Sequence, residues 1–266
     1  MTLAFHRPSS IADAAKLLAG AEDGKFLAGG MTLLPTMRQR LADPSDLVDL
    51  SSLPGLAMIE RTGDGLVIGA LTRHADVAGS EVVKAAVPAL AALAGRIGDP
   101  QVRYRGTIGG SIANNDPAAD YPAALLALDA TVVTDRREIA ADDFFLGTFE
   151  TALETDEIVT AVRFPIPLAA SYEKLRSPAS RYALVGVFVA RFADGVRVAV
   201  TGAGPCVFRS ADIEEALASA FEPSALDRIS IDASELNSDL HADADYRAHM
   251  IMVLTKRAVA AAIAGH

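Results

Sequence analysis

Two glycine pairs, far apart in the sequence, are the residues best suited to bind a ligand in this chain. Gly29-Gly30 follows the short apolar run 26–28 and precedes an apolar segment with near-helical spacing. Gly109-Gly110 lies between Thr107 and Ser111, whose hydroxyl groups can donate to phosphate oxygens. Because glycine has no Cβ, a phosphate can come close to the main-chain N–H groups. Either segment alone could be an ordinary turn; together they predict a site for a diphosphate.

Neither glycine pair belongs to a common nucleotide-binding sequence. No Gly-Lys-Ser/Thr follows either pair, and neither has the spacing G-x-G-x-x-G, so a Walker loop and a Rossmann fold are not supported. A diphosphate needs several donors, and two such turns could supply them from the main chain whatever the net charge. Valine at Gly30 or Gly110 is then expected to occupy the space of the phosphate. Asn114-Asn115, Asp116 and Asp120 follow, and either bind ligand hydroxyl groups or form turns.

Charge and cysteine content exclude several other functions. The 34 acidic residues outnumber 24 basic ones, and the net charge of −10 disfavours nucleic acid as a partner. The single cysteine, Cys206, excludes a disulfide framework and an iron–sulfur cluster held by this chain alone. The five histidines show no metal-ligand spacing, so no metal site is expected. No apolar run reaches the roughly 18 residues of a membrane span, and no secretory signal is evident, so we expect no membrane insertion and a cytoplasmic location.

The elements that must position the glycine pairs alternate between helices and strands in the first part of the chain. Ser10 predicts the N-cap of a helix ending at Gly20. The spacing predicts a strand, a glycine turn and a helix over 26–41. The region 100–122, rich in glycine, asparagine and proline, predicts a long functional loop.

A second unit is expected to start near residue 168, after a strand that ends at Pro165 and Pro167. Antiparallel strands with a hairpin turn at 193–195 are predicted there, followed by amphipathic helices. The sequence therefore predicts an α+β fold in two pieces.

Four segments, in order, resemble a known family. They are 26–50, 97–130, 156–167 and 172–191. These segments are similar to the FAD-binding (medium) subunit of molybdenum hydroxylases, which includes the carbon monoxide dehydrogenase medium subunit and the flavin domain of xanthine dehydrogenase. The resemblance implies an FAD-binding PCMH-type (vanillyl-alcohol-oxidase-like) two-part flavin domain over residues 1–167. A small antiparallel-sheet-plus-helix domain of the carbon monoxide dehydrogenase flavoprotein type would follow over 168–266.

The resemblance also implies which residues bind FAD. Segment 27–34 would surround the diphosphate, and segment 107–111 would face the cofactor from the other side. Asp120 would hydrogen-bond to FAD, and Lys174 would reach the flavin, where its charge would stabilise the anionic reduced ring; a surface strand lysine is the alternative. The complete set of implied cofactor-binding residues is Leu27, Ala28, Gly29, Gly30, Met31, Thr32, Leu33, Leu34, Ile97, Thr107, Ile108, Gly109, Gly110, Ser111, Asn115, Asp120, Val159 and Lys174.

The function implied by the resemblance is electron transfer. A large molybdenum-cofactor subunit would oxidise the substrate, and a small subunit with [2Fe–2S] clusters would pass electrons to FAD on this chain and then to an external acceptor. One cysteine fits this division, since the clusters then belong to other chains. No catalytic acid or base is expected here. The alternatives are a self-sufficient flavin-dependent oxidoreductase with its own substrate site and a cofactor-free assembly module.

Overall fold

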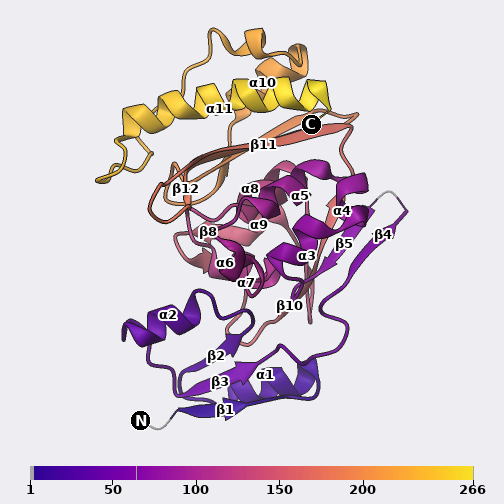
Figure 1. Ribbon diagram of the computed structural model, residues 1–266, viewed down its shortest axis with the longest axis vertical. Coiled ribbons are helices and arrows are strands. Elements are labelled where there is room, and N and C mark those ends of the chain that lie inside the picture. Colours follow the sequence, from indigo (N-terminus) through magenta and orange to yellow (C-terminus); the bar gives the residue numbers. More distant parts are fainter. Residues whose placement is uncertain (1–2, 64, 266) are drawn as a thin grey trace.

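The amino-terminal part of the molecule is a parallel sheet with one helix packed on it. The computed structural model describes residues 3–63 and 65–265, and this part lies at one end of the long axis (Figure 1). The Ser10 side chain accepts a hydrogen bond from the Asp13 N–H and caps the first helix, as predicted. Ala14 and Leu18 of that helix are buried in one cluster with Val48 of the sheet. The elements are β1 (Ala4–His6), α1 (Ile11–Ala19), β2 (Gly24–Leu27), α2 (Leu33–Arg38) and β3 (Asp46–Asp49), with strand order β1-β3-β2.

The middle part combines an antiparallel sheet with a group of short helices. The strands are β4 (Ile59–Thr62), β5 (Gly65–Gly69), β6 (Thr131–Thr134), β7 (Glu138–Ala140) and β10 (Val159–Pro165), in the order β4-β5-β10-β6-β7. The helices are α3 (His74–Gly79), α4 (Glu81–Ala86), α5 (Pro88–Gly95), α6 (Pro100–Arg103), α7 (Ile108–Asn114), α8 (Tyr121–Ala127) and α9 (Ala141–Phe144). A small hairpin, β8 (Phe145–Gly147) and β9 (Glu150–Thr151), follows α9. Every residue of α8 is buried, so this helix lies at the centre of the largest core.

The carboxy-terminal part is a four-stranded antiparallel sheet covered by helices (Figure 1). Side chains alternate between its two faces, as strand geometry requires. Phe188 and Ala190 of its second strand belong to the core of the middle part, whereas Val187 and Val189 pack in the cluster that includes the covering helices. The elements are β11 (Ala169–Arg176), β12 (Ala183–Arg191), β13 (Val196–Thr201), β14 (Phe208–Arg209), α10 (Ala211–Ser219), a 3₁₀ turn (Pro223–Leu226) and α11 (Ala244–Ala264).

The region 100–122 is not the long loop that its composition predicts. It contains α6 and α7, joined by a short turn, and α8 begins at Tyr121. Asp99 caps α6 by accepting from the Val102 N–H, and Thr107 caps α7 by accepting from the Gly110 N–H. Two turns of α7 are held in the core by Ile108 and Ile112, which are fully buried. Tertiary burial therefore overrides the low helix propensity of Gly109-Gly110.

Within residues 3–63 and 65–265, the longest helix is too polar to cross a lipid bilayer, and no other helix is long enough.

Candidate cofactor site

The two glycine segments lie directly against each other, although about 80 residues separate them in the sequence. A Cβ added to Gly29 would lie 2.1 Å from the carbonyl oxygen of Arg105 and 2.8 Å from the Cα of Gly106. A Cβ added to Gly110 would lie 3.7 Å from the Cβ of Ala28. The main chains of the two segments are therefore too close at Gly29 for any side chain. This confirms that the segments fold together, as the sequence analysis expected.

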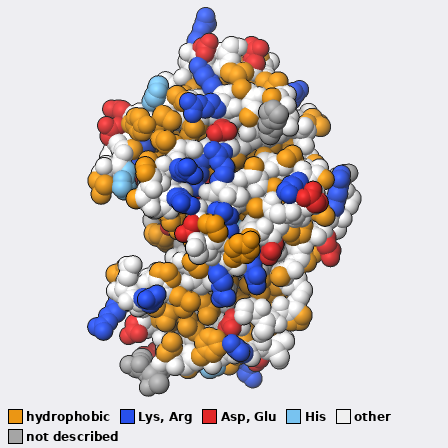
Figure 2. All heavy atoms as spheres, in the orientation of Figure 1, with side chains coloured by type: hydrophobic (Ala, Val, Ile, Leu, Met, Phe, Trp, Pro, Cys, Tyr) orange, Lys and Arg blue, Asp and Glu red, His pale blue; other side chains and the backbone are white. Residues whose placement is uncertain are grey.

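A cavity of about 520 Å³ opens where these segments meet. Its walls come from the amino-terminal part (25–33), from the middle part (97–120 and 153–159) and from segment 180–182 between β11 and β12. Lys25 and Arg181 lie at its wall, and Figure 2 shows Lys and Arg side chains gathered across the middle of this face. Asp116, Asp120 and Glu157 line the same cavity, so an anionic ligand would have to be held mainly by main-chain donors there.

The first glycine segment presents consecutive main-chain donors to the cavity. The N–H groups of residues 29–32 have no acceptor among the described residues, and all four residues line the cavity. Gly30 has a φ of +72°, in the left-handed region that favours glycine. Successive N–H groups around such a residue form a concave site that binds anions. A diphosphate needs hydrogen-bond donors that no protein group occupies, and these N–H groups meet that need.

The second glycine segment contributes differently from the expectation. The N–H groups of Ile108 and Gly109 donate to the carbonyl oxygens of Thr72 and Ala70, at 3.1 and 2.8 Å. The Gly110 N–H donates to the Thr107 hydroxyl at 3.1 Å. The main-chain donors of residues 108–111 are thus occupied, and in this segment only the Thr107 N–H has no acceptor among the described residues. This segment instead lines the cavity with its two glycines, which have no Cβ atoms, and with the Ser111 side chain.

The glycine geometry also corrects the expected effect of valine. At Gly30 an added Cβ would meet the Leu34 side chain at 2.9 Å and that of Leu27 at 3.2 Å, so it would not point into open space. Its damage would come from these contacts and from the positive φ. At Gly110, which is exposed to the cavity, a Cβ would lie 3.0 Å from the Thr107 hydroxyl.

Most of the residues expected to bind FAD line this cavity. Those that do so are Leu27, Ala28, Gly29, Gly30, Met31, Thr32, Leu33, Ile97, Thr107, Gly109, Gly110, Ser111, Asp120 and Val159. Leu34, Ile108, Asn115 and Lys174 are not among the lining residues. Asn115 turns its amide towards the β8–β9 hairpin, where it donates to the carbonyl oxygens of Gly147 and Glu150 at 2.8 Å each. Ile108 is fully buried in the core.

Lys174 is not a surface strand lysine, which was the alternative to a lysine that reaches the flavin. Its side chain is 1% exposed, and Nζ lies 2.8 Å from Oδ1 and 3.0 Å from Oδ2 of Asp120. The Tyr172 hydroxyl donates to the same carboxylate, at 2.5 Å from Oδ1. Burial raises the pKa of Asp120, and the charge of Lys174 and the two hydrogen bonds oppose that rise. Asp120 lies at the cavity wall, and Lys174 lies behind it.

His74 and Glu157 are among the wall residues that were not expected. His74 is 5% exposed, and burial lowers the pKa of its imidazole to about 4, so the ring is neutral at physiological pH. Its Nδ1 has no partner among the described residues, and its main-chain N–H donates to the Gly106 carbonyl. Glu157 precedes β10. No spacing in the sequence distinguishes either residue from a core or surface residue.

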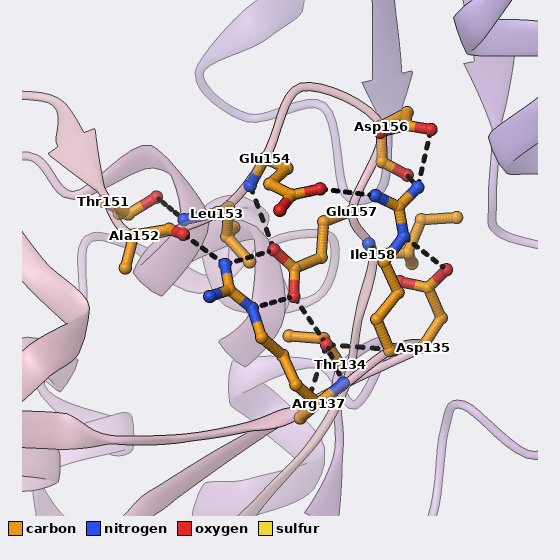
Figure 3. Close-up of polar contacts among 11 residues, drawn as sticks. Thr134, Asp135, Arg137, Thr151, Ala152, Leu153, Glu154, Asp156, Glu157 and Ile158 are labelled. Carbon is orange, nitrogen blue, oxygen red and sulfur yellow. Dashed lines mark hydrogen bonds and ion pairs between the residues drawn. The ribbon is translucent and has the colours of Figure 1, made fainter.

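Glu157 is held at the wall by a polar cluster (Figure 3). Arg137 forms two hydrogen bonds with its carboxylate, from Nε to Oε1 and from Nη2 to Oε2, at 2.9 and 2.8 Å. The Thr134 hydroxyl and the Glu154 N–H donate to the same group. The side chain is fully buried, and the Arg137 hydrogen bonds lower the pKa of Glu157 to about 2. The cluster joins β6 to the segment that carries Ile158 and Val159 into the cavity wall.

We expect Glu157→Gln to lower the free energy of unfolding by about 2 kcal/mol at pH 7, because it weakens hydrogen bonds to a buried charge. The folded-state pKa is depressed, so the charge stabilises the fold above pH 4.5, and this contribution is lost as the pH falls towards 2. The difference between the two proteins should therefore shrink below pH 4.5. Urea denaturation between pH 3 and 7 measures it.

Asp156→Asn is the matched control for this prediction. Asp156 adjoins Glu157 and pairs with Arg136, but its side chain is 32% exposed. Exposed ion pairs contribute less than about 1 kcal/mol. Equal losses in the two variants would mean that burial of Glu157 is not what stabilises this wall.

The two glycine segments meet at a cavity where main-chain donors without an acceptor suit a cofactor that contains a diphosphate. The family model described as the FAD binding domain in molybdopterin dehydrogenase matches residues 1–167, and the chain belongs to this family. This confirms the resemblance inferred from the sequence, and with it FAD as the cofactor. The N–H groups of residues 29–32, which have no acceptor among the described residues, and the cavity of about 520 Å³ fit that cofactor.

Relatives and solved structures match nearly the whole chain. The nicotine 6-hydroxylase medium subunit of Paenarthrobacter nicotinovorans is 39% identical, with 96% of this chain and 95% of the relative covered. The carbon monoxide dehydrogenase medium chain of Hydrogenophaga pseudoflava is 38% identical, with 97% and 96% covered. A reconstituted carbon monoxide dehydrogenase from Oligotropha carboxidovorans has a chain with a TM-score of 0.91 and 34% identity, covering 100% of this chain and 99% of its own.

Proposed function

We propose that this chain is the FAD-carrying electron-transfer subunit of a multi-subunit, molybdenum-dependent dehydrogenase. The observation that supports this most is the contact between the two glycine segments at a cavity, in a chain of the FAD-binding family. The N–H groups of residues 29–32, which line this cavity, have no acceptor among the described residues. Relatives of nearly equal length are named medium subunits or chains of a hydroxylase and a dehydrogenase.

In the proposed site, the N–H groups of Gly29, Gly30, Met31 and Thr32 hold the diphosphate. The main chain at Gly109 and Gly110 closes the opposite side, and Ile97 and Val159 give apolar contacts that exclude water. Asp120 accepts a hydrogen bond from the cofactor and orients it. When bound, FAD supplies the ability to accept and release electrons. The protein's own part is binding, orientation and the electrostatics of the pocket, and we assign no acid or base to it.

We propose two partner subunits and an external acceptor. A large subunit would carry the molybdenum cofactor, and a small subunit would carry [2Fe–2S] clusters. This is supported by the word "medium" in the names of the relatives and by the single cysteine, which cannot hold a cluster alone. We also propose a cytoplasmic location, which fits a chain with one cysteine.

The proposed division of the chain is a PCMH-type flavin domain over 1–167 and a carbon monoxide dehydrogenase flavoprotein-type domain over 168–266. It is supported by the change of sheet between β10, which ends at Pro165, and β11, which begins at Ala169. Tyr172 and Phe188 nevertheless pack into the core of the first domain, so the two units share an apolar interface.

We expect the protein, purified with the chains that assemble on it, to hold one FAD per copy of this chain. Absorption spectroscopy and cofactor release by acid measure this. The chain alone should show no dehydrogenase activity, and activity should require the partner chains. An assembly that releases no FAD would support the assembly-module alternative, and substrate oxidation by the chain alone would support the self-sufficient enzyme.

A further inference from the structure

We propose that Tyr172 is a positioning residue, which holds the Asp120 carboxylate towards FAD and so makes the carboxy-terminal sheet part of the flavin site. This inference rests on the proposed FAD binding. Asp120 immediately precedes α8 in the middle part of the molecule, whereas Tyr172 belongs to β11 of the last sheet. The two residues are 52 positions apart, and their side chains meet in the interior.

The hydrogen bonds to Asp120 decide which oxygen remains free. An ionised carboxylate has about four acceptor positions. Oδ1 receives the Tyr172 hydroxyl at 2.5 Å and Lys174 Nζ at 2.8 Å, and Oδ2 receives Lys174 Nζ at 3.0 Å. With Oδ1 occupied by donors from β11, one position of Oδ2 is left for an N–H or O–H group of the cofactor. Lys174 contacts both oxygens, so it neutralises charge but does not distinguish them; Tyr172 does.

Tyr172 is itself fixed by the surrounding structure. Its residue is 3% exposed, and Nη1 of Arg96 donates to its main-chain carbonyl oxygen at 2.8 Å. The Arg96 guanidinium also lies 6.0 Å from the centroid of the Tyr172 ring. Arg96 follows α5 and precedes Ile97 of the cavity wall. The hydroxyl therefore has little freedom to leave Asp120, as positioning requires.

The groups that act on the pKa of Asp120, through charge or through a hydrogen bond, come from several elements. Lys174 and Tyr172 belong to β11, and Arg96 follows α5. Burial raises the pKa of Tyr121 in α8 and of Tyr182, and the charge of Asp120 in turn raises both further. Removing the Tyr172 hydroxyl takes away one donor to the ionised carboxylate. The pKa of Asp120 should then rise, and a site that needs the ionised form should weaken at a higher pH.

The test is FAD titration of the deflavinated assembly that contains the full chain. Tyr172→Phe should raise the Kd for FAD about tenfold, as expected for one hydrogen bond to a charged group. On acidification, its affinity should begin to fall at a higher pH than that of the unsubstituted protein. In an Asp120→Asn background, Tyr172→Phe should cause no further loss and no shift of the pH profile.

Tyr121→Phe is the matched control. Tyr121 adjoins Asp120 in the sequence, is fully buried, and its hydroxyl has no partner within the described chain; it does not line the cavity. The Kd for FAD should be unchanged in this variant. An unchanged Kd in Tyr172→Phe, or the same loss with Asp120→Asn present, would overturn the inference while leaving FAD binding intact. Failure of the unsubstituted protein to take up FAD would instead overturn the proposed function.

Discussion

Gly29→Ala is expected to abolish FAD binding and to lower the free energy of unfolding by about 2 to 3 kcal/mol. The added methyl carbon would lie 2.1 Å from the Arg105 carbonyl oxygen, and main-chain atoms cannot give way as a flexible side chain can. The two glycine segments would have to separate. The donors of residues 29–32 would then leave their position opposite Gly110.

Gly20→Ala is the control in the same part of the molecule. Gly20 has a φ of −87°, and its added Cβ would meet atoms no closer than 3.5 Å, which is ordinary contact. FAD content and the urea midpoint should therefore stay near those of the unsubstituted protein. Normal FAD content in Gly29→Ala would show that the close approach of the two segments is not needed for binding.

The second large effect is expected for Lys174→Met. The lysine and Asp120 are 1% and 5% exposed, and removing one partner leaves an uncompensated buried charge. The free energy of unfolding should fall by about 3 to 5 kcal/mol. The resemblance implied only that Lys174 would reach the flavin and stabilise the anionic reduced ring. Because the structure places Lys174 on Asp120, we now expect FAD affinity to fall as well. Denaturation and FAD titration measure the two effects.

A second substitution separates charge from packing in this prediction. Asp120→Asn combined with Lys174→Met removes both charges, so most of the lost stability should return. FAD affinity should remain low, since the oriented carboxylate is gone. If the double variant were as unstable as Lys174→Met, the loss would come from packing around the lysine stem, and the ion pair would not be its cause.

The local elements of this fold could be predicted because their signals are short-range. The Ser10 cap and the turn at 193–195 both depend on neighbouring residues, and both occur where expected. The helix α7 could not be found in this way. Its glycines and asparagines indicate a loop, and only the burial of Ile108 and Ile112 in the core stabilises a helix there.

The site was predictable in its location but not in its hydrogen bonds. Glycine pairs that must tolerate close main-chain contact are visible in the sequence, and both lie at the cavity. Which N–H groups remain free depends on Thr72 and Ala70, which pair with segment 107–111 only in the folded chain. The sequence gives only a weak indication that Tyr172 belongs to the site. Tyr172 lies two residues before Lys174, so both side chains share one face of β11.

The most direct test of the account is a structure of the FAD-loaded assembly that resolves the cofactor diphosphate. We predict that its oxygens lie within about 3.2 Å of the N–H groups of Gly29 to Thr32, with Gly110 opposite and with Asp120 within hydrogen-bonding distance of the cofactor. A diphosphate bound elsewhere, with these N–H groups facing only solvent, would contradict the account.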